Sequence, residues 1–283
     1  VREYNLTAGS EVDITENPEG VLISAQLAKR EKNISLDVSD YDNSLMITNL
    51  LNHAYRLGYD IIQLKYSSEK QYSEIVKITS TRLLGFEVVR NQKHECILQN
   101  IAEPDAEKFE VMLRKFFLIC KEQSEFLSNL NQVNLQQLNE YKLQNDRLAN
   151  YLRRTLIRSK VLGETSFLVY LIVGNVSYVN HALFYLFNYI KTSKKVPRKE
   201  TRDLCNKTKE MYSLFYQAFY NKDYSFLDML GKNKMSVDAS INHLLEKWKG
   251  PDNVILCYLK EVTRMIHLCV PPTLGVIIQS TKQ

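Results

Sequence analysis

Hydrophobic residues change their spacing along the chain, and these changes divide it into three parts. In the first part, residues 1–28, two short runs at 10–14 and 20–24 are rich in β-branched residues and flank the sequence NPEG. This pattern predicts a β-hairpin in which proline and glycine supply the turn. Because two strands alone are only marginally stable in water, we expect the hairpin to need further chain or a second subunit.

The second part, residues 33–104, alternates between strand-like and helix-like spacing. The pattern predicts strands at 34–38, 60–66, 85–89 and 95–99, and helices at about 45–57 and 69–82. Gly58 occupies the position of a glycine that ends a helix. The last two strands are expected to form a hairpin that turns at 91–93, so the second part should be a small α/β unit.

The third part, residues 105–283, has the spacing of helices. Proline is excluded from helix interiors, and the stretches 105–196 and 198–250 contain none. The pattern predicts six helices, at about 105–131, 133–160, 165–191, 198–221, 225–249 and 252–270. Their connections are short, as antiparallel neighbours in a bundle require. The predicted fold class is therefore mainly α, with a small α/β unit and a partial β-hairpin domain before the helices.

An internal repeat is visible among the predicted helices. The spacing Lys-xxx-Asp-xxx-Asn occurs at 142–150 and again at 234–242, and such positions lie along one helix face. His181 and His267 follow similar runs in the third helix of each half, so they could meet across the bundle. These matches predict two three-helix units, repeat 1 at 105–191 and repeat 2 at 198–270.

Composition narrows the class of protein. The 283 residues are 45% hydrophobic and 24% charged, which is typical of a soluble globular protein. The net charge of +5 is too small to indicate a nucleic-acid binder by itself. The five cysteines form no CxxC pair, which indicates reduced thiols and a cytoplasmic location. Because the chain begins at Val1, we expect further sequence before it.

One segment, 165–190, contains no charged residue other than histidine and is long enough to span a bilayer. It also carries Asn175, Asn180 and His181, whose polar side chains are unfavourable in lipid. We interpret the segment as the central helix of a bundle. The protein is expected not to span the membrane and to be at most peripheral to it.

Two motifs carry a resemblance to a known family. The sequence GYD at 58–60 and the sequence GFE at 85–87 stand in the α/β unit, followed by duplicated helices with an aspartate near the centre of the second and the fifth. This layout resembles archaeal PhoU-like proteins. The hairpin at 1–28 is similar to the second half of an AbrB-like swapped-hairpin domain, which precedes the PhoU-like part in many relatives.

The resemblance implies a non-enzymatic regulator of phosphate uptake that contacts a phosphate transporter or its signalling partner. It also implies a homodimer that binds DNA through an intact N-terminal domain, although the first strands of that domain are absent here. An alternative is a DNA-binding transcription regulator whose helices only dimerise or bind another ligand. A second alternative is a metal-binding helical bundle.

Metal binding in PhoU-like bundles uses a Glu/Asp-xxx-Asp motif, from which this chain departs. The first acidic position is Lys142 before Asp146, and Lys234 before Asp238. A lysine ammonium has no lone pair to offer a metal and should instead pair with the aspartate one turn later. We therefore expect no cofactor, with Asp146 and Asp238 as positional candidates if a divalent metal or iron does bind.

Other candidate residues have two interpretations each. A basic run between the repeats could bind an acidic partner, phosphate or lipid headgroups, together with Arg153, Arg154, Arg158 and Lys160, or it could be a solvated loop. The run consists of Lys191, Lys194, Lys195, Arg198, Lys199 and Arg202. The aromatic residues between 212 and 220 have helical spacing and predict core or subunit interface. No motif for catalysis is present.

Overall fold

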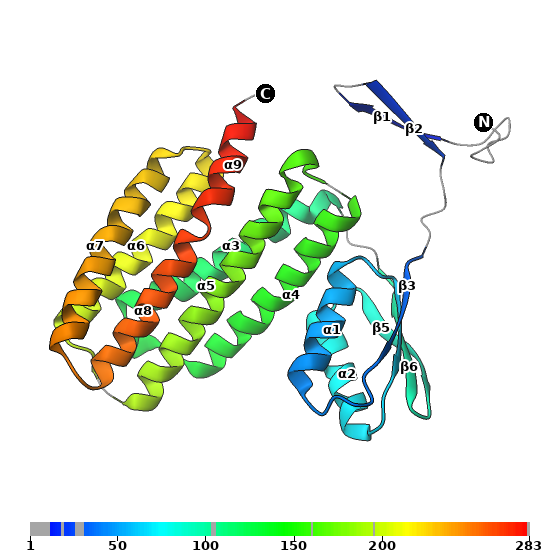
Figure 1. Cartoon of the computed structure of the whole chain (residues 1–283), viewed down its shortest axis with the longest axis horizontal. Coiled ribbons are helices and arrows are strands. Elements are labelled where there is room, and N and C mark those ends of the chain that lie inside the picture. Colours follow the sequence, from blue (N-terminus) through cyan, green and yellow to red (C-terminus); the bar gives the residue numbers. More distant parts are fainter. Residues whose placement is uncertain are drawn as a thin grey trace.

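The computed structural model describes residues 12–17, 20–25, 31–102, 106–159, 161–194 and 196–281. Within these ranges the protein is mainly helical and has one small mixed sheet (Figure 1). The strands are β1 Val12–Asn17, β2 Gly20–Ala25, β3 Asn33–Asp37, β4 Ile61–Lys65, β5 Phe86–Gln92 and β6 Glu95–Asn100. The helices are α1 Ser44–Arg56, α2 Glu69–Arg82, α3 Phe109–Glu125, α4 Leu135–Ser159, α5 Ser166–Ser193, α6 Lys199–Asn221, α7 Ser225–Lys247, α8 Pro251–His267 and α9 Val270–Ser280.

Strands β1 and β2 pair in antiparallel fashion, as the hairpin prediction requires. The predicted turn residues Pro18 and Glu19 lie outside the described residues. The sheet of the α/β unit has the order β3-β4-β6-β5, in which β3 and β4 are parallel and the other pairs are antiparallel. Helices α1 and α2 cover one face of this sheet (Figure 1).

Local sequence explains where the two helices of the α/β unit begin. The Asn43 side chain accepts a hydrogen bond from the amide of Leu45 at the start of α1. Ser68 and Gln71 form a reciprocal capping box at the start of α2. Such caps satisfy amide groups that the first helical turn leaves without partners.

Helix α5 is the central helix of the bundle. It packs against α3, α4, α8 and α9, and its uncharged sequence follows from burial on several sides. Among the described residues, side chains from every helix between α3 and α9 contribute to one main hydrophobic core. Ala218, Leu227 and Ile277 form a small separate cluster. A central bundle helix is therefore the observed role of the 165–190 segment.

Three boundaries differ from the sequence prediction. The turn between β5 and β6 lies at Lys93 and His94, after predicted turn residues 91 and 92, because β5 continues to Gln92 beyond an irregularity between Val88 and Arg90. The predicted helix 105–131 ends as α3 at Glu125 and continues as short 3-10 turns. A further helix, α9, follows α8 where none was predicted. Its prolines at 271 and 272 lie in the first turn, where a missing amide proton removes no helical hydrogen bond.

The α/β unit docks on the bundle through its helices. Both α1 and α2 contact α4, so the helical layer lies between the sheet and the bundle (Figure 1). The opposite face of the sheet is turned away from the bundle (Figure 1). Among the described residues, the buried charged side chains Asp60, Asp146 and Arg154 all lie at this contact surface.

Candidate functional site

A buried ion pair joins the α/β unit to the bundle. The Arg154 side chain of α4 is fully buried, and its Nη2 lies 2.7 Å from Oδ1 of Asp60. Arg158, one turn later, places Nη1 2.7 Å from Oδ2 of the same carboxylate. Burial raises the pKa of Asp60, but the Lys32 amide and the two guanidinium groups outweigh it, so the pKa is lowered. The carboxylate is therefore charged and shared by two arginines.

The backbone around Asp60 completes this ion pair. Arg154 also donates to the carbonyl oxygens of Tyr55 and Tyr59, and its guanidinium lies over the rings of Tyr55 and Phe86 at 5.0 and 5.1 Å. Gly58 has a φ of +82°, and a Cβ there would lie 2.7 Å from Cδ of Arg158. Glycine is thus required for both the turn and the close approach. The GYD sequence, residues 58–60, thus supplies hydrogen-bond acceptors to Arg154 and Arg158 of α4.

A second polar cluster surrounds Asp146, two turns earlier on α4. Its carboxylate lies 2.7 Å from Nε2 of His181 on α5, 2.9 Å from Nη1 of Arg82 on α2 and 3.7 Å from Nζ of Lys142. Burial raises the pKa of Asp146, but the hydrogen bond and electrostatic attraction of His181, together with Arg82 and Lys142, outweigh burial, so the pKa is lowered. One carboxylate therefore connects α2, α4 and α5.

The second Lys-Asp pair repeats part of this arrangement on α7 and α8. Nζ of Lys234 lies 2.6 Å from Oδ2 of Asp238, as the spacing predicts. His267 of α8 is close enough to both charges for its pKa to respond to them. Burial and Lys234 lower that pKa, and Asp238 partly opposes them. His181 thus contacts the aspartate of the preceding helix, and no contact with His267 is seen among the described residues.

The environment of both aspartates bears on metal binding. Within the described part of the chain, no group of three or more His, Cys, Asp and Glu side chains is placed to hold a metal ion. Asp146 is surrounded by cations, and the position one turn before each aspartate carries the lysine ammonium with which it pairs. Both carboxylates are thus paired with basic side chains of the same chain.

The structure divides the predicted basic run between α5 and α6 into residues with internal partners and exposed residues. Arg198 packs over the Trp248 ring at 4.5 Å and lies 3.7 Å from Asp252, so an internal partner neutralises it. Lys194 ends α5 with a φ of +51°, and Lys199 and Arg202 are exposed in the first turn of α6. Lys191 is half-buried in the last turn of α5, and Lys160 and Lys195 lie outside the described residues. Of the predicted partner-binding arginines on α4, Arg154 and Arg158 bind Asp60 of this same chain instead.

The aromatic series on α6 is core, as predicted. Phe215 and Phe219 stack on Phe117 with centroids 5.5 and 4.8 Å apart, and the Tyr212 hydroxyl donates to the Phe117 carbonyl. Of the five cysteines, Cys257 alone is exposed. Burial raises the pKa of the Cys120 thiol to about 12.

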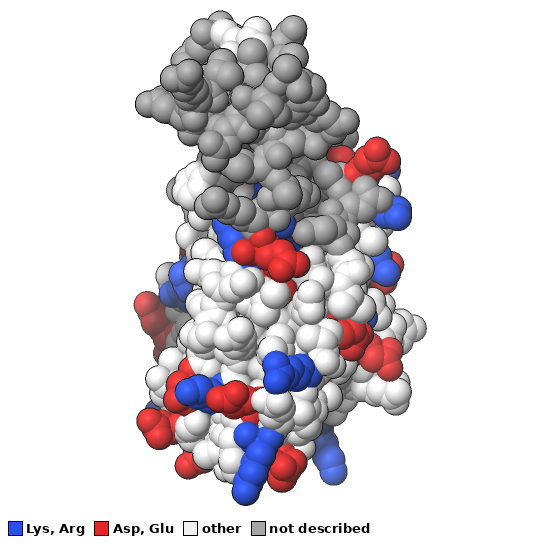
Figure 2. Space-filling view, turned by 90° about the vertical axis from the view of Figure 1, so that its right-hand side faces the viewer, with Lys and Arg blue, Asp and Glu red and all other residues white. Residues whose placement is uncertain are grey.

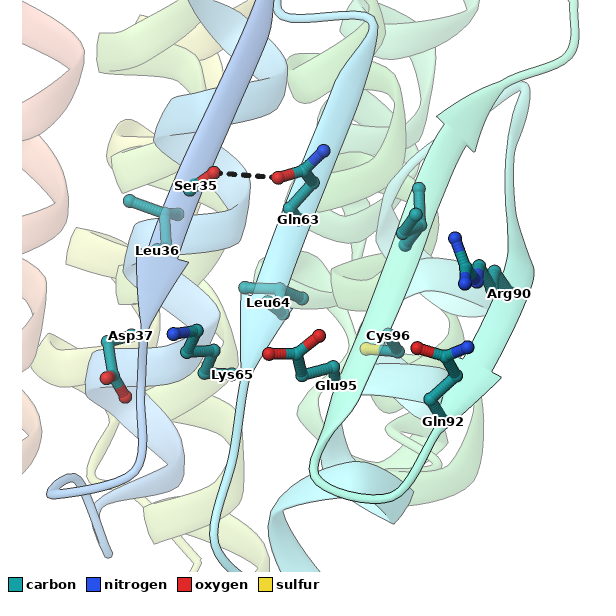
Figure 3. Close-up of a pocket in the computed structure, with 11 residues that line it drawn as sticks. Ser35, Leu36, Asp37, Gln63, Leu64, Lys65, Arg90, Gln92, Glu95 and Cys96 are labelled. Atoms are coloured by element: carbon teal, nitrogen blue, oxygen red, sulfur yellow. Dashed lines mark hydrogen bonds between the residues drawn. The ribbon is translucent and has the colours of Figure 1, made fainter.

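The open face of the sheet forms a shallow hollow of about 370 Å³. Ser35 donates to Gln63 across the strands, and Asp37, Lys65 and Glu95 follow one another across the sheet (Figure 3). On this side of the molecule acidic and basic side chains are interspersed with uncharged ones (Figure 2). The hollow has no predominant charge and offers no group poised for catalysis.

Two helical segments of the described chain are long and apolar enough to cross a membrane. They are Gly163–Ser193, whose most apolar window is 56% buried, and Pro251–Ser280, whose window is 39% buried. The sequence pattern drew attention to the first alone, because the second is interrupted by charged residues and by two prolines.

Sequence reasoning missed several residues of the junction between α/β unit and bundle. Asp60 and Arg82 stand in ordinary positions at the start of a strand and the end of a helix, and their partners are more than 60 residues away. The available signal was an arginine at both 154 and 158 on one helix face, which is unusual in a buried surface unless a carboxylate faces it.

No family model matches the chain, and no curated protein or solved structure is significantly similar to it. The fold and site define a mainly helical protein with a small mixed α/β unit docked on its second bundle helix.

Proposed function

We propose that this protein is a non-enzymatic regulator that responds to phosphate and controls phosphate uptake through contacts with a transporter or its signalling partner. The role in phosphate uptake is what the resemblance of the sequence to PhoU-like proteins implies. The polar contacts of Asp146 support the proposal, because this residue links Arg82 of the α/β unit to His181 of α5 in the bundle. A change in α5 would thereby alter how α2 is held.

The same proposal includes two copies of a three-helix unit, α3 to α5 and α6 to α8. Each copy has a Lys-Asp ion pair on its second helix and a histidine beside that aspartate on its third. The third helices, α5 and α8, pack against each other. This arrangement supports the duplication, and it gives the central helix a position where it meets both copies.

The transporter contact can be tested by co-purification. The protein is immobilised and a phosphate-transporter ATPase is applied at low salt, with and without phosphate. We expect retention that depends on phosphate and that falls at least about tenfold when the exposed basic residues are replaced by K194Q, K199Q and R202Q, because charge pairs at an interface raise affinity. Equal loss with the matched control K70Q, K77Q and K93Q, three exposed lysines of the α/β unit, would contradict a specific surface.

The second candidate is a DNA-binding regulator whose helices only dimerise. The observation in its favour is the β1-β2 pair, since a two-stranded sheet is stable only when more strands join it. In this case a longer chain carrying the complete N-terminal domain would bind its operator equally with and without phosphate. It would also fail to retain the transporter ATPase.

A further inference from the structure

Two arginines of the described chain, Arg56 of α1 and Arg153 of α4, lie at the junction without a carboxylate partner. Arg56 of α1 donates from Nε to Oδ1 of Asn150 at 2.7 Å, and Arg153 of α4 lies over the Tyr170 ring at 5.1 Å. Among the described residues, neither guanidinium has a carboxylate oxygen within 4 Å, in contrast to Arg82, Arg154 and Arg158.

The positive charge of Arg153 acts on the Arg56 guanidinium. Burial, together with the like charge of Arg153, lowers the pKa of Arg56 to about 10. The pKa of His53, one turn earlier on α1, is lowered by burial and by both arginines. The carboxylate that acts electrostatically on both arginines is Asp146, which already pairs with Arg82, Lys142 and His181. The site therefore holds more positive charge than its own acids neutralise.

Packing holds the donors at this position. A Cβ at Gly174 of α5 would lie 2.4 Å from Nη2 of Arg153, so the guanidinium lies directly against the helix backbone. Nε of Arg153 is buried without a hydrogen-bond partner among the described protein atoms. Access from solvent remains at the edge, because His53 is exposed and the Tyr178 side chain is 55% exposed.

We propose that Arg56 and Arg153 form a binding site for a tetrahedral oxyanion of the phosphate class between α1, α4 and α5. Planar guanidinium groups present paired N–H donors that match phosphate oxygens. An anion bound between two guanidinium groups attracts both and offsets the repulsion between them. Tyr170 and Tyr178, which act electrostatically on Arg153, carry hydroxyl groups that are further hydrogen-bond donors in this region. The ligand would contact the α/β unit through α1 and the bundle through α4 at the same time.

This site rests on the proposed function for its biological meaning, whereas binding itself can be measured without a transporter. The whole chain is titrated by calorimetry with inorganic phosphate, with sulfate and with phosphoserine, each against sodium chloride of equal ionic strength. We expect saturable binding of phosphate and a rise in melting temperature that chloride does not produce. Tighter binding of inorganic phosphate would assign the free ion, and tighter binding of phosphoserine a phosphoryl group on a larger molecule.

Substitutions locate the site. R56Q and R153Q should each weaken phosphate binding by at least about tenfold, because each removes one charged donor pair. R147Q removes an exposed arginine of the same helix and should leave binding unchanged. If a glutamine variant does not fold, R56K and R153K keep the charge but lose the planar donor pair, and they should also weaken binding.

The variant G174A moves the Arg153 guanidinium without changing any charge. We expect it to weaken phosphate binding. The melting temperature of the ligand-free variant should show that the protein still folds. The proposal is overturned if phosphate binds no better than chloride, or if R56Q and R153Q bind it as well as the wild type does. Failure of the transporter experiment alone would leave this binding result intact.

Discussion

At the scale of single residues, the buried charges of α4 dominate the energetics. Arg154 is fully buried, and burial of an ion without a partner is highly unfavourable. Asp60 and the carbonyl oxygens of Tyr55 and Tyr59 offset that penalty. The Arg154–Asp60 pair favours one arrangement of the α/β unit on α4, because the attraction between the two charges weakens when the units move apart.

Replacing Asp60 by asparagine should therefore destabilise the protein strongly. The variant leaves Arg154 and Arg158 facing a neutral side chain, and we expect the free energy of unfolding to fall by about 3–5 kcal/mol. Urea denaturation monitored by circular dichroism measures this change. The matched control is D228N, because Asp228 pairs with Lys232 on an exposed helix face, where such pairs contribute less than about 1 kcal/mol. Similar losses in both variants would refute the assigned role of Asp60.

Asp146 predicts a dependence of stability on pH. Its pKa is lowered in the folded protein, so the folded state keeps this carboxylate charged at pH values where the unfolded chain binds a proton. The resulting stabilisation is complete above the ordinary value of about 3.9 and is lost as pH falls through the folded-state pKa. We expect D146N to be less stable at neutral pH and to show a shallower loss of unfolding free energy below about pH 5. Parallel pH profiles for the two proteins would argue against it.

Residue-level prediction from sequence was correct where partners are near in the chain. Lys142 and Asp146, like Lys234 and Asp238, are one helical turn apart, and their pairing follows from helix geometry alone. The arginine clusters could not be assigned in this way. Arg154 and Asp60 are 94 positions apart, so only the folded arrangement shows that this basic group serves the interior.

At the scale of elements, helices and strands followed from hydrophobic spacing and from caps. The predicted positions of α1, α2, α4 to α8 and the strands agree with the structure to within a few residues. The missed helix α9 has a physical reason. Proline in a helix interior ends or kinks the helix, so the pair at 271 and 272 indicates a helix end. A proline in the first turn is compatible with a helix, as Pro251 at the start of α8 also shows.

Two glycine substitutions test the backbone inside α7 and directly before β5. Gly231 lies inside α7, and a Cβ there would meet nothing within 4 Å, so G231A should raise the free energy of unfolding by roughly 0.5–1 kcal/mol through helix propensity. Thermal unfolding provides the measurement.

The comparison variant is G85A, which we expect to lower the melting temperature. Gly85 has a φ of +80°, and a Cβ there would lie 2.3 Å from the Ala102 carbonyl oxygen. If G85A were as stable as the wild type, the close packing of the GFE sequence against the end of the sheet would be wrong.

At the scale of the whole molecule, the junction should make the α/β unit and the bundle unfold together. We expect one thermal transition for the wild-type chain, because Arg82, Arg154 and Arg158 each connect the units. Combining D60N with R82Q should separate it into two transitions in a calorimetric scan. A single transition in the double variant would mean that apolar packing of α1 and α2 on α4 is sufficient for coupling.

The short distance along the chain between the hairpin and the sheet has a consequence for any assembly. Strand β2 ends at Ala25 and β3 begins at Asn33, so covalent geometry limits their separation to about 25–30 Å. If two hairpins were to associate, their helical bodies would be confined to a small shared volume at high effective concentration. Even weak attraction between those bodies would then be sufficient to keep them engaged.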